Sequence, residues 1–168
     1  MQETDLLIRT KLCPPFIRPS LVPRPRLQRR IEAGLRVPLT LIVAPAGFGK
    51  TTLVAVGTSS SKVRLAWLSL DRDDNRVGRF LNYLVAALQE VDKTIGRHAA
   101  QLMAGMQQVL PEAVLTSLVN DLNTTGTEIA LVLDDYQFIS NHAIHEAVAF
   151  LLEHCPNSFH LLLQLWPG

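Results

Sequence analysis

The sequence has 168 residues, which suits one domain with a hydrophobic core of its own. An apolar fraction of 48% and a mean hydropathy of +0.18 exclude a disordered chain, and no apolar run approaches the roughly 20 residues that cross a membrane. The net charge of +1 argues neither for nor against nucleic acid as a partner.

Residues 1–36 are predicted to be a basic lead-in segment. Its prolines, at positions 14, 15, 19, 23 and 25, predict irregular backbone up to residue 26, because proline fixes φ and donates no hydrogen bond. A short helix is predicted over residues 27–35, with Leu27, Ile31 and Leu35 on one face. A solvated arm is the simpler interpretation of the many arginines, and contact with phosphate or a partner is the alternative.

The most informative stretch is LTLIVAPAGFGKTT, residues 39–52. Five apolar or β-branched residues predict a buried strand, which runs into a small-residue turn and then a helix. Strand, glycine-rich turn and helix N-terminus together form a phosphate-binding loop, in which bare backbone N–H groups face the phosphates. The residues expected to hold a nucleotide are Ala46, Gly47, Phe48, Gly49, Lys50, Thr51 and Thr52.

Two side chains of this loop have distinct expected roles. Lys50 would reach the β- and γ-phosphates, and the Thr51 hydroxyl would bind Mg²⁺. Ala44 occupies the position where the pattern G-x-x-x-x-G-K-[ST] has its first glycine. Alanine is acceptable there if its φ is negative, because only a positive φ strongly demands glycine.

Strands and helices alternate through the remainder of the chain. We expect strands at 63–70, 128–133 and 159–165, and helices at 51–57, 76–91, 111–123 and 143–153. Residues 92–110 are expected to hold a further helical piece that is broken at Gly96 and Gly105. Asp74 or Asn75 is the expected N-cap of the helix at 76–91. The alternation predicts an α/β fold in which helices cover both faces of a mostly parallel sheet.

A second candidate half of the site follows the apolar run at 129–133. Asp134 would lie at the carboxyl edge of the sheet, where it could hold Mg²⁺, and Asp135 could orient or deprotonate an attacking water. Two aspartates that merely cap the next turn are the alternative. His142 and His145 have helical spacing, but two histidines are too few for a metal site, so packing is favoured.

The sequence resembles the MalT-like, LuxR-type large transcriptional activators, which belong to the STAND class of P-loop NTPases. The likeness rests on ordered blocks along nearly the whole chain, namely TKL with PP at 10–15, RPSLVPRPRL at 18–27, APAGFGKTT at 44–52, AWLSLD at 66–71, DN and RFL at 74–81, and LVLDDY with IHE at 131–146.

Family membership would imply ATP or ADP with Mg²⁺ as ligands, and a nucleotide-controlled switch for oligomerisation and transcription. It also implies that Ala44 is normal, and that the segment from Arg18 to Arg24, with Arg18, Leu21 and Val22 as binding residues, closes over the adenine side of the nucleotide.

The chain departs from the family pattern near its end. The family ends its fourth strand with Ser/Thr-Arg, whose arginine senses the γ-phosphate, whereas residues 161–168 contain no arginine. We therefore expect a three-layer P-loop NTPase core over residues 37–168 that is truncated after the fourth strand. It would lack the winged-helix, sensor and DNA-binding parts, so we expect no direct DNA binding and at most slow ATP hydrolysis.

Three functional hypotheses remain open from the sequence. The first is a nucleotide-binding switch that associates with itself or with other domains of the same regulator. The second is a P-loop ATPase or kinase with genuine turnover, in which Asp135 is the catalytic base. The third is a degenerate interaction module that keeps the fold without the nucleotide. Two cysteines without metal spacing and a polar N-terminus predict a cytoplasmic protein.

Overall fold

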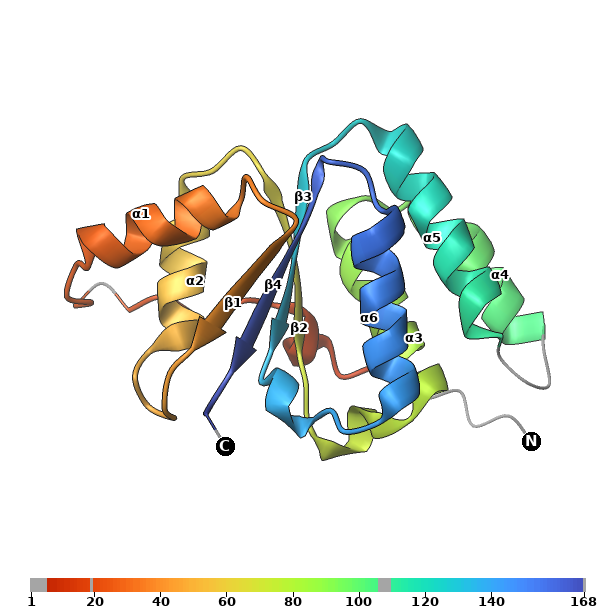
Figure 1. The fold of residues 1–168 in the computed structure, drawn as a ribbon, viewed down its shortest axis with the longest axis horizontal. Helices are drawn as coiled ribbons and strands as arrows, with labels where there is room; N and C mark the ends of the chain where they lie inside the picture. Colours follow the sequence, from red (N-terminus) through yellow and green to blue (C-terminus); the bar gives the residue numbers. More distant parts are fainter. Residues whose placement is uncertain (1–5, 19, 106–109, 168) are drawn as a thin grey trace.

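The computed structural model describes residues 6–18, 20–105 and 110–167. Four parallel strands form one sheet in the order β1-β4-β3-β2 (Figure 1). The strands are β1 (Leu39–Val43), β2 (Arg64–Ser69), β3 (Ile129–Asp134) and β4 (Phe159–Leu165). Because all four are parallel, their carboxyl ends share one edge of the sheet, and the loops that follow β1, β3 and β4 meet there.

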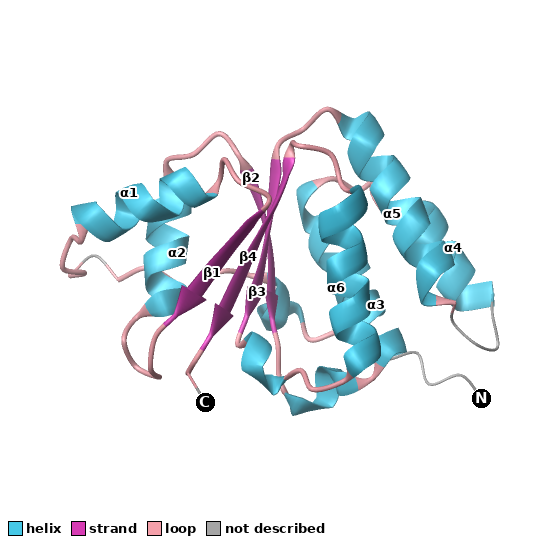
Figure 2. Ribbon diagram, in the orientation of Figure 1, coloured by secondary structure: helices cyan, strands magenta, loops and turns pink. Residues whose placement is uncertain are grey.

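Helices cover the sheet on both faces, as Figure 2 shows. One face carries α1 (Pro25–Gly34) and α2 (Lys50–Ser59), which pack on each other. The other face carries α3 (Val77–Val91), α5 (Pro111–Thr125) and α6 (His142–His154), with α4 (Arg97–Gly105) packed on α3 and α5. Three short 3-10 turns complete the described chain: η1 (Arg9–Leu12), η2 (Arg72–Asn75) and η3 (Tyr136–Phe138).

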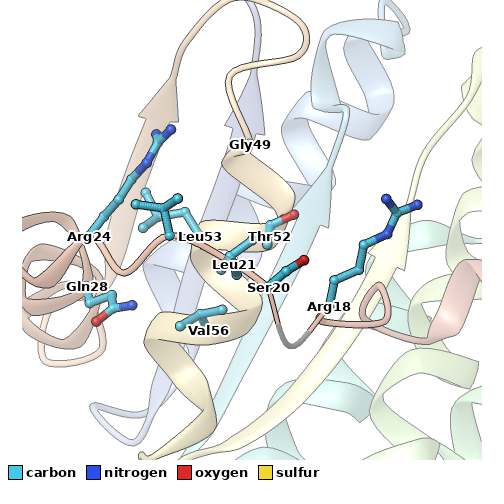
Figure 3. A pocket seen from close by; sticks show the side chains of 10 residues that line it. Arg18, Ser20, Leu21, Arg24, Gln28, Gly49, Thr52, Leu53 and Val56 are labelled. Atoms are coloured by element: carbon cyan, nitrogen blue, oxygen red, sulfur yellow. The ribbon is translucent and has the colours of Figure 1, made fainter.

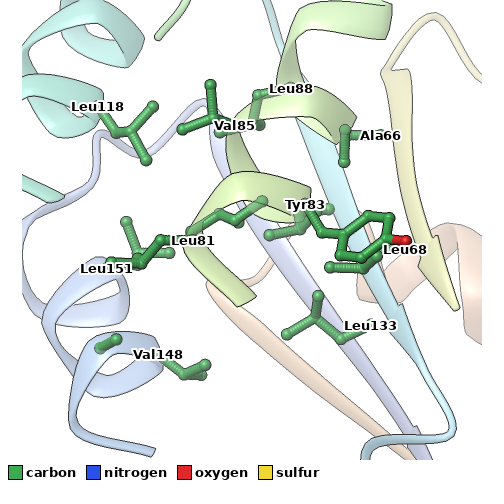
Figure 4. Packing of buried hydrophobic residues seen from close by; sticks show 14 of the residues in the cluster. Ala66, Leu68, Leu81, Tyr83, Val85, Leu88, Leu118, Leu133, Val148 and Leu151 are labelled. Carbon is green, nitrogen blue, oxygen red and sulfur yellow. The ribbon is translucent and has the colours of Figure 1, made fainter. Parts of the chain in front are cut away.

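Strand β3 separates two hydrophobic clusters. Leu131 and Leu133 belong to the larger cluster beneath α3, α5 and α6, in which Figure 4 shows Leu133. Ala130 and Val132 belong to the smaller cluster beneath α1 and α2. This division follows from the two-residue alternation of a strand, and it explains why β3 is apolar at every position before Asp134. The predicted burial of this strand is confirmed.

Three expectations from the sequence were wrong. Helix α1 begins at Pro25, because the first position of a helix needs no N–H donor. Neither Asp74 nor Asn75 is the N-cap of α3; that residue is Arg76, which makes no side-chain capping bond, and Asp71 caps η2 instead. Strand β1 is only partly buried: it lies at the edge of the sheet, and Leu41 is 57% exposed.

The other predicted elements are confirmed to within a few residues, including the start of α5 at Pro111 and the helical piece that ends at Gly105. In the described ranges, no helix is both long enough and apolar enough to span a bilayer.

Candidate functional site

The turn between β1 and α2 has the backbone of a phosphate-binding loop. Gly47 and Gly49 have φ values of 81° and 74°, and Gly49 is the N-cap residue of α2. A Cβ at either glycine would meet nothing within 4 Å, so glycine is required here by the backbone conformation and not by crowding. Ala44 is not among the residues with positive φ, which explains why it tolerates a side chain.

The Lys50 side chain folds back into this turn. Its ammonium group donates hydrogen bonds to the carbonyl oxygens of Ala44 and Pro45, at 2.6 and 3.1 Å, and the residue is 8% exposed. The first turn of α2 contains no acidic residue. Unpaired N–H groups, the positive end of the helix and a nearby ammonium group together favour an anion at this position.

Thr51 and Asp134 connect the loop to β3. The Thr51 hydroxyl donates to the Asp134 carboxylate at 3.0 and 3.2 Å, and Asp134 is 4% exposed. Burial raises the pKa of Asp134, and the charge of Asp135 adds to this effect, while the Thr51 hydroxyl and Lys50 oppose it. A buried carboxylate of this kind favours a nearby cation.

The donor set fits Mg²⁺ bound together with a phosphate. Thr51 and Asp134 supply hard oxygen ligands, and the described residues include no group of three or more His, Cys, Asp or Glu side chains that could hold a metal alone. Mg²⁺ characteristically takes one or two protein oxygens and completes its coordination with phosphate and water.

Asp135 has the only positive φ among the described non-glycine residues, at 59°. Its Oδ1 accepts hydrogen bonds from Gln137 Nε2 at 3.0 Å and from the Trp166 indole at 3.1 Å. Trp166 also packs edge-on against Phe138. Sequence reasoning did not find Gln137 or Trp166. The available signal was that Trp166 directly follows β4, whose carboxyl end neighbours that of β3.

A hollow of about 290 Å³ lies beside the loop, between the lead-in segment and α2 (Figure 3). Arg18, Leu21 and Val22, expected from the sequence, line it together with Gly49 and Thr52. Ser20 and Arg24, which belong to the same expected segment, also line it, as do Gln28, Leu53 and Val56, which sequence reasoning did not find. The position of Val56, one helical turn beyond Thr52, was the available signal.

The remaining loop residues lie outside the hollow. Ala46, Gly47 and Phe48 are exposed, and the Arg24 guanidinium donates to the Phe48 carbonyl oxygen at 3.5 Å. The structure therefore brings most of the expected residues into two adjoining places. Lys50, Thr51 and Asp134 meet where phosphates and a cation would lie, and Arg18, Leu21 and Val22 lie opposite Thr52.

Gln164 is a further polar residue of this region. It pairs in register with Ile42 on β1 and lies one position beyond the Leu133–Leu163 pair, which places it beside Asp134. Leu162 belongs to the cluster beneath α2, so strand alternation turns Gln164 toward the same face. It is fully buried, and neither atom of its amide group has a hydrogen-bond partner.

Known proteins of similar sequence are transcriptional regulators. No family model matches the sequence. The HTH-type transcriptional regulator MalT of Yersinia pestis (strain Pestoides F) is 37% identical over 161 residues, which are 94% of this chain and 17% of that protein. The MalT protein of Serratia proteamaculans (strain 568) is 38% identical over the same shares. This chain is similar to one part of the MalT regulators. It spans about a sixth of the length of these regulators.

A solved structure extends the comparison to the fold. Cdc6p from Pyrobaculum aerophilum superimposes with a TM-score of 0.56 at 14% identity, over 96% of this chain and 43% of that one. At this identity the likeness concerns the fold alone. With the parallel sheet, it confirms the predicted α/β P-loop NTPase fold.

Proposed function

We propose that this MalT-like chain binds Mg²⁺ with ATP or ADP and serves as the nucleotide-responsive part of a transcriptional regulator. The observation that carries the proposal is the Thr51–Asp134 hydrogen bond, which joins the turn after β1 to the end of β3. A hydroxyl and a buried carboxylate at this position, beside two glycines in the left-handed region, form a site for a cation and a phosphate.

Each part of the nucleotide has a candidate position. The phosphates would lie on the N–H groups at residues 46–52, with Lys50 released from the Ala44 and Pro45 carbonyls to neutralise them. Thr51 and Asp134 would hold Mg²⁺, which would neutralise phosphate charge when bound. The hollow lined by Leu21, Val22 and Val56 would take the adenine, because much of its wall is apolar.

The switch role is proposed from the relatives. They are HTH-type transcriptional regulators, and this chain matches a sixth of their length. We propose that the nucleotide state controls contacts with a second copy or with other domains of such a regulator, in the cytoplasm, without direct DNA binding by residues 1–168. Light scattering measures the oligomeric state without nucleotide, with ADP and with ATP. The same oligomeric state under all three conditions would argue against the switch.

Calorimetric titration with Mg-ADP and Mg-ATP tests the site. Lys50→Ala is expected to abolish binding, whereas Lys62→Ala, which changes an exposed lysine in the turn after α2, should bind like the wild type. Equal affinity of the Lys50→Ala variant and the wild type would overturn the assignment. A wild-type chain that gains no thermal stability from saturating nucleotide would instead favour the interaction module without nucleotide.

ATP hydrolysis with genuine turnover is the second candidate function. The position of the Asp135 carboxylate is the observation that favours it. Its carboxylate is held at the carboxyl edge of the sheet, directly after the proposed metal ligand. Phosphate release that is lost in Asp135→Asn, with nucleotide affinity retained, would identify an ATPase in which Asp135 is the base. Residues 159–167 contain no arginine, so we propose that any hydrolysis is slow.

A further inference from the structure

A cluster of charged residues attaches the lead-in segment to the rest of the domain. The residues of this cluster are distant in sequence from the phosphate-binding loop. Lys11 lies on η1, which packs on β2 and α3. Its ammonium group donates to Asp71 Oδ2 at 2.9 Å and to Asp74 Oδ2. Lys11 is 8% exposed and Asp74 is fully buried. We call Lys11, Asp71, Asp74, Arg79 and Tyr83 the anchor cluster.

Helix α3 supplies the rest of the anchor cluster. The Arg79 Nε donates to Asp74 Oδ1 at 3.2 Å, and the Lys11 ammonium group lies 4.6 Å from the centre of the Tyr83 ring. The Tyr83 hydroxyl accepts the backbone N–H of Ile8 at 3.1 Å. The lead-in segment is therefore held at two points, a side chain at Lys11 and a backbone group at Ile8.

The charges make this attachment specific. A lysine is almost never buried unless it is paired, and removal of one partner of a buried pair leaves the other charge uncompensated. Burial alone would lower the pKa of Lys11, but hydrogen bonds and charges from Asp74 and Asp71 outweigh it and raise the pKa above its ordinary value. The ammonium form is thus the form that the cluster retains.

The chain leads directly from the anchor cluster to the hollow. Five residues after Leu12, including Pro14 and Pro15, connect η1 to Arg18, and the two prolines limit the conformations of this connection. Arg18, Ser20 and Leu21 then form the wall of the hollow that faces α2 (Figure 3), and Val22 also lines the hollow. The opposite wall, at Thr52 and Val56, belongs to the helix that follows the phosphate-binding loop.

We propose that Lys11 and Asp74 are positioning residues for the nucleoside part of the ligand. They hold the wall formed by Arg18, Ser20, Leu21 and Val22 against α2, so that the base is enclosed on both sides, while the phosphates depend on the loop alone. The inference rests on the proposed nucleotide site, and it separates the two halves of that site. Loss of the anchor cluster should weaken recognition of the base without weakening recognition of the phosphates.

The test compares two ligands by calorimetry on the full chain, Mg-ADP and Mg-pyrophosphate, which is the phosphate part alone. The variants are Lys11→Met and the control Lys62→Met, which changes an exposed lysine outside the cluster. Lys11→Met is expected to lower ADP affinity at least tenfold and to leave pyrophosphate affinity within twofold of wild type. Unchanged ADP affinity, or an equal loss for both ligands, would overturn the proposal.

Hydrogen exchange gives a readout that needs no nucleotide. In the ligand-free protein, Lys11→Met is expected to speed exchange at residues 8–18 while leaving β3 unchanged, and unchanged exchange at residues 8–18 would overturn the anchoring step. If Lys11→Met does not fold, Tyr83→Phe serves instead, because it keeps the ring and removes only the hydroxyl bonded to Ile8. Tyr83→Phe should also lower ADP affinity without lowering pyrophosphate affinity, and it should also speed exchange at residues 8–18. Wild-type values of both quantities in Tyr83→Phe would overturn the proposal. If exchange is faster in Lys11→Met but the wild-type chain binds neither ligand, the anchoring by Lys11 stands and only the proposed nucleotide site is refuted.

Discussion

The Thr51 hydroxyl donates a hydrogen bond to the Asp134 carboxylate at 3.0 Å, although 83 residues separate the two in sequence. The contact exists because β1 and β3 are parallel and end at the same edge of the sheet, with β4 between them. It places a hydroxyl at the start of a helix beside a buried carboxylate. The first prediction follows from the cost of burying that carboxylate.

Asp134→Asn should separate stability from binding. Burial and the charge of Asp135 raise the Asp134 pKa, so a neutral amide should stabilise the nucleotide-free protein at neutral pH. The same change removes a proposed Mg²⁺ ligand, and we expect the Mg²⁺-dependent part of nucleotide affinity to fall on the order of tenfold or more. Urea unfolding and calorimetry with and without Mg²⁺ measure the two effects. A variant that binds Mg-ADP as well as wild type would contradict the metal role.

Gly49→Ala should destabilise the loop through its backbone alone. At a φ of 74°, an L-residue other than glycine is strained by roughly 1–2 kcal/mol, and the new methyl group would touch nothing within 4 Å. Gly49→Asn is the matched control, because asparagine adopts positive φ more readily than alanine. In urea unfolding we expect Asn to cost less than Ala. The reverse order would show that side-chain contacts, and not φ, decide this position.

Gln164→Met should stabilise the nucleotide-free protein. Both amide atoms of Gln164 are buried without a partner, and a buried unsatisfied polar group costs about 1–3 kcal/mol. Methionine has a similar volume and no such requirement. The check is the urea midpoint, with Gln137→Met as the control, since Gln137 makes hydrogen bonds to Asp135 and Trp166. A lower midpoint for Gln164→Met would indicate that a bound water or another group satisfies the amide.

Stability should depend on pH through Asp71. Burial would raise its pKa, but the hydrogen bond and charge of Lys11, aided by the Asp73 N–H and the charge of Arg79, lower it. Because the folded-state pKa lies below the unfolded value of about 3.9, Asp71 stabilises the fold above that value. This contribution is lost as the pH falls through the folded-state pKa. The unfolding free-energy difference between wild type and Asp71→Asn should therefore shrink below about pH 4.

Asp73→Asn, at an exposed position, is the control for this pH dependence. Lys11→Met tests whether Lys11 is its cause. Asp73→Asn should show a smaller loss of stability at neutral pH, because Asp73 lies outside the anchor cluster. In a Lys11→Met background, the Asp71→Asn effect should lose most of its pH dependence. A pH dependence that persists without Lys11 would mean that the other neighbours, the Asp73 N–H and Arg79, lower the Asp71 pKa.

Local patterns were enough to predict most of the secondary structure. Strand β4 and the start of α5 match the sequence expectation, because apolar period and an N-terminal proline are properties of neighbouring residues. The exposure of β1 was not predictable in this way. An edge strand and a central strand can share the same apolar sequence, and only strand order separates them.

In the candidate site too, residues of local sequence motifs were predictable and residues with distant partners were not. Lys50, Thr51 and Asp134 were predictable because each belongs to a short motif with its own physical requirement. Trp166, Gln164 and the anchor cluster were not, because their partners lie far away in sequence. Lys11 and Asp74 are 63 residues apart, and Trp166 and Asp135 are 31 apart. Lys11 and Asp74 meet because the lead-in segment packs on α3. Trp166 and Asp135 meet because β3 and β4 end side by side.

Trp166 should report on the state of the site. The chain has two tryptophans: Trp67 is 1% exposed within the cluster beneath α2, and Trp166 is 38% exposed with its indole N–H on Asp135. A nucleotide with Mg²⁺ beside Asp134 would change the field at Asp135 and therefore the emission of Trp166. We expect Mg-ADP to shift the fluorescence of the wild type and of Trp67→Phe, but not of Trp166→Phe.

The stability of Trp166→Phe tests the same contact without a ligand. Phenylalanine keeps one aromatic ring against Phe138 and loses the fused pyrrole ring with its N–H donor to Asp135. Because Trp166 is partly solvated, the loss should stay below about 1 kcal/mol in urea unfolding, less than for a buried bond to a charged group. A full nucleotide-induced fluorescence change in Trp166→Phe would place the responsive tryptophan at Trp67. The nucleotide would then act through α2 and the smaller core cluster, and not through Asp135.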